Sequence, residues 1–124
     1  MAAINPTIVR EVGTGDGSVV RVTWTPITSA DTCTAIALPE YTEKSIQALG
    51  TFGSGNVAVH GSNDAGVTFA ALNDPAGTVI DITAAGIKKI LEPTEYIKPV
   101  VTTGDGTQSL TLVVLAVRMN SLRT

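Results

Sequence analysis

The stretch VAVHGSNDAGVTFAALND, Val57–Asp74, carries a local pattern that is informative about the fold. Val57 and Val59 alternate with small or polar residues, which is the period of a strand with one buried face. Residues 61–66, GSNDAG, form a cluster of turn-forming residues, after which Val67 and Phe69 alternate in the same way. Alternating runs on both sides of such a cluster are typical of a β-hairpin. We therefore expect a hairpin whose inner face carries these four apolar side chains.

The same period-2 pattern appears near the start of the chain. In GSVVRVTWT (17–25), Val20, Val22 and Trp24 share one face, which predicts a half-buried strand with Trp24 in the core. PTIVREV (6–12) precedes it across a GTGDG turn, so the chain should begin with a hairpin. Residues 44–50 are ambiguous between a strand and one helical turn. Further strands are expected at 33–38, 56–62, 66–72, 78–83, 95–103 and 108–119.

The last of these strands, QSLTLVVLAVRM, is apolar on both faces. Leu110, Leu112 and Val114 alternate with Val113 and Leu115. A strand covered on both sides is either central in its sheet or lies under a subunit interface. This pattern therefore favours a homo-oligomer.

One short helix is expected over TAAGIKKILEP, residues 83–93. Thr83 can cap its start, Ile87 and Ile90 lie close to one face, and Pro93 stops it. Short strands with regular turns otherwise predict an all-β fold. We expect one domain spanning 1–124, an antiparallel, jelly-roll-like β-sandwich with one short helix and short polar terminal arms.

Composition excludes several classes of function. The chain of 124 residues carries a net charge of -3 with scattered Lys and Arg, which argues against nucleic-acid binding. No apolar run approaches the ~20 residues of a membrane helix, and we expect no signal peptide. Cys33 is the single cysteine, which excludes an internal disulfide and a cysteine metal cluster. Its apolar surroundings predict a buried, inert thiol.

The chain shows no recognisable catalytic or metal-binding motif. Its one histidine, His60, and Cys33 lie on separate expected strands, so a nucleophile–base pair is not indicated. Asp16, Asp64, Asp74 and Asp105 lie in turns that could offer oxygens to calcium, but tight turns use these residues for their own geometry. We therefore expect a protein that is not an enzyme and that has no metal and no cofactor.

Partner contacts are expected from exposed tips instead. Phe52 is the one aromatic residue in a Gly-rich loop, and His60 stands beside the turn, out of phase with the core valines. The candidate contact residues are Phe52, His60, Ser62, Asn63, Asp64 and Tyr41.

The turn and its flanking strands resemble the discoidin-like, galactose-binding jelly rolls, in which a Gly-Ser-Asn-Asp-Gly turn precedes an aromatic strand. Here Ala65 is inserted before Gly66, and Phe69 stands where a Trp is often found. A wider order, GSNDAG…F, DPAGTVIDITAAGIKKI, EYIKPVVTTGDG and a long Val/Leu strand ending in Arg118, is similar to small virion proteins of tailed bacteriophages, including head decoration (cement) proteins.

This second resemblance implies a non-enzymatic β domain, often trimeric, seated on the capsid surface. The expected function is a decoration protein that binds the major capsid protein, stabilises the head and is assembled in the bacterial host cytoplasm. The alternative is a carbohydrate-binding module of a phage tail or baseplate. A third hypothesis, a small hydrolase with a site between subunits, rests only on His60, Glu40 and Glu43.

Overall fold

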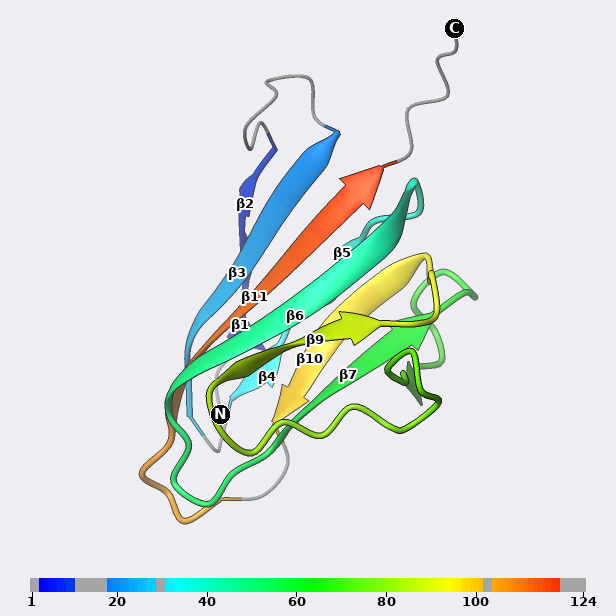
Figure 1. Cartoon of the computed structure of the whole chain (residues 1–124). Helices are drawn as coiled ribbons and strands as arrows, with labels where there is room; N and C mark the ends of the chain where they lie inside the picture. The colour runs from blue at the N-terminus through cyan, green and yellow to red at the C-terminus, as the bar shows by residue number, and fades with distance from the viewer. Residues whose placement is uncertain (1–2, 11–17, 29–30, 102–103, 119–124) are drawn as a thin grey trace, which may run out of the picture.

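The computed structural model describes residues 3–10, 18–28, 31–101 and 104–118. Over these residues the regular structure consists of β-strands arranged in two larger sheets and one small one (Figure 1). The strands are β1 (Ala3–Ile4), β2 (Thr7–Val9), β3 (Val19–Ile27), β4 (Thr32–Cys33), β5 (Ile36–Ala37), β6 (Tyr41–Thr51), β7 (Val57–Ser62), β8 (Ala70–Ala71), β9 (Gly86–Ile90), β10 (Tyr96–Val101) and β11 (Ser109–Arg118).

The larger sheet has five strands in the order β2-β3-β11-β6-β9, and every pair in it is antiparallel. The last long strand, β11, lies at its centre between β3 and β6, which is one of the two positions that its apolar sequence allows. The ambiguous segment 44–50 belongs to β6 and is therefore strand. The expected first hairpin is present as β2 paired with β3, while its turn at 13–17 lies outside the described residues.

The second sheet has four strands in the order β5-β10-β7-β8. The expected strand 33–38 is divided into β4 and β5, and β4 pairs in parallel with β1 near the start of the chain. This short parallel pair is an exception to the otherwise antiparallel pairing. Residues Ala3 to Val9 are thus attached to the fold by β1 and β2, while 1–2 and 119–124 lie outside the described residues.

One buried core lies between the two larger sheets, which gives a sandwich-like arrangement (Figure 1). The inner positions of β3 and β11 are fully buried, including Trp24 at 0% exposure, which confirms the alternation read from the sequence. Val57, Val59 and Ile97 of the second sheet belong to the same core. The indole Nε1 of Trp24 donates to the carbonyl of Thr34 at 2.8 Å and so ties the β4–β5 segment to β3.

The expected helix over 83–93 is wrong, because Gly86–Ile90 forms the edge strand β9 along β6. Gly86 weakens a helix at this point, and the free edge of β6 offers backbone partners along its length. Only Ile90 is buried there, while Ile87 is 65% exposed. The run Ile-Lys-Lys-Ile therefore does not alternate, and its spacing resembles one helical turn.

The hairpin at 57–72 is present only in part. β7 carries Val57 and Val59 inward as expected, but its partner β8 is limited to Ala70–Ala71. The prediction that Val67 and Phe69 enter the core is wrong: Val67 is 80% exposed and Phe69 is half-buried. The chain curls into a hydrogen-bonded loop before it reaches the strand, and this loop shifts the phase of the residues that follow.

Leu72 fills the core position that the hairpin pattern assigned to Phe69. The expected strand at 78–83 is likewise reduced to isolated bridges, one from Val79 to Asn73 and one from Ile82 to Val57. Ile80 and Ile82 are nevertheless buried, so this segment closes the core without belonging to a regular strand.

Candidate interaction surfaces

The Ser62–Thr68 loop, which follows β7, is held in one shape by the side chain of Asp64. Its Oδ1 accepts hydrogen bonds from Ser62 Oγ at 2.6 Å, from the Thr68 amide at 2.9 Å and from the Val67 amide at 3.2 Å. The Ser62 hydroxyl oxygen in turn accepts from the Gly66 amide at 3.1 Å. The hydrogen bond from Ser62, followed by that from Thr68, lowers the pKa of Asp64 to about 2. Asp64 is thus a carboxylate over the whole ordinary pH range.

A second set of contacts fixes this loop to the segment that enters β10. Asn63 Oδ1 accepts from the amide of Glu95 at 3.0 Å, and Glu95 Oε1 accepts from the amide of Ala65 at 3.1 Å. Ala65 has a φ of 65°, a left-handed conformation that few non-glycine residues adopt. Gly66 follows with a φ of 81°, which favours glycine, and it lies over the ring of Tyr96. The Ser62–Thr68 loop is therefore preorganised.

Val67 stands on this preorganised loop with 80% of its surface exposed. An apolar side chain held out by a hydrogen-bonded loop loses little conformational freedom when a partner covers it. Sequence reasoning identified the tip of this turn but placed Val67 in the core. Val67 is exposed because the hydrogen bonds to the Asp64 side chain bend the chain into a loop at this point. The alternation of apolar and polar residues in the sequence does not indicate these bonds.

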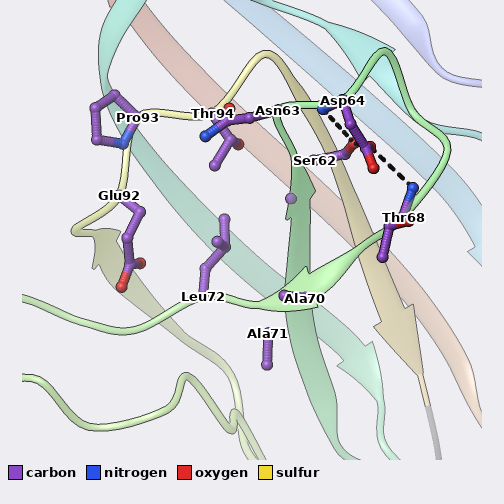
Figure 2. A pocket seen from close by; sticks show the side chains of 11 residues that line it. Ser62, Asn63, Asp64, Thr68, Ala70, Ala71, Leu72, Glu92, Pro93 and Thr94 are labelled. Atoms are coloured by element: carbon purple, nitrogen blue, oxygen red, sulfur yellow. Dashed lines mark hydrogen bonds between the residues drawn. The ribbon is translucent and has the colours of Figure 1, made fainter.

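A shallow hollow of about 710 Å³ lies beside the loop, between β8 and the segment Glu92–Thr94 (Figure 2). Glu92 is already engaged: its oxygens accept from the Asn73 backbone amide at 2.8 Å and from Asn73 Nδ2 at 2.6 Å. Partial burial acts to raise the pKa of Glu92, but these bonds outweigh it and leave the pKa below its usual value. Figure 2 also shows the Thr68 amide donating to the Asp64 carboxylate and the Asp64 amide donating to Ser62 Oγ. The acidic groups of the hollow therefore serve the fold.

The outer sheet face, defined as the side of the five-stranded sheet away from the core, is the second candidate surface. The register places Val9, Arg21, Leu115, Ser45 and Lys89 in one row across the five strands. Two shallow hollows, of about 190 and 180 Å³, lie beside Leu115 on this face. Apolar side chains that are each at least 36% exposed are spread over it: Val9, Leu49, Ile87, Leu115 and Val117.

The remaining predicted contact residues are less accessible. Tyr41 is only 7% exposed, and Phe52 is half-buried against the core. His60 is half-buried in β7 opposite Lys98, and burial, followed by the charge of Lys98, lowers its pKa. Ser62 is buried within the loop network. Of the predicted set, the exposed residues are Asn63 and Asp64.

Two further findings concern the residues that the structure describes. They contain no group of three or more His, Cys, Asp and Glu residues placed to hold a metal ion. No helix in the same part of the chain is long and apolar enough to cross a membrane.

Comparison with known proteins shows likeness of fold only. No family model and no curated protein matches the chain. The crystal structure of the SPBc2 prophage-derived protein YomS is similar, with a TM-score of 0.57 and 12% identity over 80% of this chain and 94% of that one. A protein of the disulfide-linked pili of Bacillus endospore appendages has a TM-score of 0.41 and 16% identity over 92% of this chain and 91% of that one. Neither is described as a discoidin-like domain or a capsid decoration protein.

Proposed function

We propose that this protein is a non-enzymatic structural subunit of a bacteriophage particle, and more specifically a decoration protein that binds the major capsid protein on the head surface. The observation that carries the proposal is the Ser62–Thr68 loop, which is rigid and presents Val67 almost fully exposed. Preorganised apolar anchors of this kind are typical of sites that dock on another protein.

Two further observations support it. A prophage-derived protein shares the fold. The carboxylates of Asp64 and Glu92 beside the loop already accept hydrogen bonds from the protein itself. This arrangement suits a structural protein better than a site that must bind a small ligand. The carbohydrate-binding alternative gains no support from the hollow, since its lining contains no aromatic ring on which a sugar could stack. The hydrolase hypothesis is not favoured by any contact of His60, Glu40 or Glu43 with one another.

The test is co-sedimentation of the purified chain with heads of the encoding phage that were prepared without this protein. Wild type is expected to bind in a fixed ratio to the capsid protein. Covering Val67 should contribute about 1.5–3 kcal/mol, so Val67→Asp should weaken binding roughly 10- to 150-fold. Val79→Asp is the matched control, because Val79 is also exposed, at 53%, but lies outside the loop.

Absence of wild-type binding to any head preparation would overturn the proposal. So would equal affinity of the Val67 and Val79 variants, because the loop would then have no part in attachment. Both variants should melt like the wild type, since neither side chain is in the core.

A further inference from the structure

We propose that a second copy of this chain docks on the outer sheet face, with a twofold axis running along β11. Val113, Leu115 and Val117 point outward from this central strand, and Leu115 and Val117 remain 38% and 36% exposed. The neighbouring columns add Leu49 on β6 and Ile87 on β9. The column of β11 is the most apolar of the face and therefore the natural position for an axis that places a strand opposite its own copy.

The distribution of charge selects the direction of that axis. Arg21 lies on β3, on one side of β11, and Glu43 lies on β6, on the other side. A twofold axis along β11 exchanges these two sides, so β3 of one copy faces β6 of the other. Arg21 then meets Ser45 of the second copy, with Glu43 about 6.8 Å further along the strand, within reach of an arginine side chain.

The other in-plane axis, perpendicular to the strands at the row of Leu115, would place β3 over β3 and Arg21 over its own copy. Like charges placed opposite each other are destabilising. Arg21 makes no ion pair within the part of the chain that the structure describes, whereas Glu43 already contacts Lys89 at 2.7 Å. The parallel axis places Arg21 beside the Glu43–Lys89 ion pair of the second copy, which carries no net charge, whereas the perpendicular axis places it over a like charge.

The free edge of β9 is a poorer site for a second copy. Antiparallel pairing of two β9 strands about their centre would set Lys88 opposite Lys88, with both lysines exposed. Lysine on an edge strand is a common device against such pairing. A second copy is therefore better placed on the face of the sheet than along its edge.

The size of the face is sufficient for such an interface. Strands spaced ~4.8 Å apart and residues spaced ~3.4 Å apart give a face roughly 24 Å by 24 Å over five strands and the outward residues of β11. Because side chains protrude from the sheet, the solvent-accessible area of this face is larger than its flat area and approaches the ~800 Å² per partner of a standard interface. Packed sheets cross at about 30°, so each β11 would lie about 15° from the axis.

The first test is the mass of the purified full-length protein in solution. Wild type should have twice the mass of one chain, and Leu115→Glu should raise the dimer dissociation constant at least 100-fold. Leu91→Glu is the control, because Leu91 is 47% exposed but follows β9 outside the outer sheet face. Circular dichroism checks that each variant is folded. A monomer, a trimer, or a dimer whose mass does not respond to Leu115→Glu would overturn the inference.

The second test examines the axis itself and does not depend on stability. In a Cys33→Ala background, Val113→Cys should be linked to its own copy by a short bismaleimide that matches the ~10 Å between packed sheets. Arg21→Cys should not link to itself but should link to Ser45→Cys when the two variants are mixed. Self-linking of Arg21→Cys without that mixed product would overturn the parallel axis. The inference does not rest on the proposed function, because particle binding uses the Ser62–Thr68 loop.

Discussion

Replacing Gly61 by alanine tests whether the Ser62–Thr68 loop depends on close packing at the end of β7. A methyl group at Gly61 would stand 2.5 Å from Thr94 Oγ1, 2.9 Å from Thr94 Cγ2 and 3.0 Å from Leu72 Cδ1. Ordinary contacts begin near 3.4 Å, so the Thr94 side chain would have to move. Overpacking of this kind costs about 1–3 kcal/mol, and reduced freedom of the unfolded chain returns about 0.4–1 kcal/mol.

We therefore expect Gly61→Ala to lower the free energy of unfolding by about 1–2 kcal/mol, measured by urea denaturation followed by circular dichroism. Thr94→Ala alone should cost about 1 kcal/mol, since it removes the hydrogen bond from Thr94 Oγ1 to the Tyr96 carbonyl at 2.8 Å. The double variant Gly61→Ala/Thr94→Ala should lose little more stability than Thr94→Ala alone, because the two shortest contacts of the new methyl group are with Thr94, and only the 3.0 Å contact with Leu72 Cδ1 remains. A double variant whose loss equals the sum of the single losses would refute this reasoning.

Three further outcomes follow from the core. Trp24→Phe should cost about 2 kcal/mol in urea denaturation, because it removes the hydrogen bond to Thr34 and leaves a small cavity; no loss would contradict the role of the indole. Burial lowers the pKa of Lys44, so the unfolded chain holds that proton more tightly and stability should rise from the lowered pKa toward pH 10.5. Over this pH range the urea midpoint should rise less in Lys44→Met than in wild type. Equal rises in the two proteins would contradict burial of the Lys44 ammonium. Burial, followed by the charge of Asp31, raises the pKa of Cys33 to about 12, so iodoacetamide at pH 8 should label the folded thiol about a thousandfold more slowly than the urea-unfolded one; equal rates would place Cys33 at the surface.

Strands with a clear period were predictable from the sequence. The sequence of β3 alternates from Val19 to Trp24, and Val20, Val22 and Trp24 are buried as expected. The inner residues of β11, such as Leu112, are buried too, although this strand is apolar on both faces. The two apolar faces of β11 left two positions open, the centre of a sheet or a subunit interface, and the structure places β11 at the centre of its sheet. These features were readable because burial of one face imposes a period on the sequence that does not depend on distant partners.

Edges and loops were not predictable in the same way. β9 exists because β6 offers it a pairing edge, and its own sequence carries a helix-like spacing. Val67 is exposed because Asp64 gathers hydrogen bonds from Ser62, Val67 and Thr68, which no periodic pattern encodes. Of the candidate contacts, Asn63 and Asp64 were placed correctly at an exposed tip, whereas Tyr41 was not recognised as buried.

The proposed attachment of the chain to a phage head runs through the Ser62–Thr68 loop. Titration of wild type, Val67→Asp and Val79→Asp against undecorated heads, with the bound fraction read after sedimentation, tests it most directly. Wild type and Val79→Asp should bind saturably at the same ratio to capsid protein, and Val67→Asp should bind at least tenfold more weakly. Unsaturable binding, no binding, or identical curves for all three proteins would contradict it.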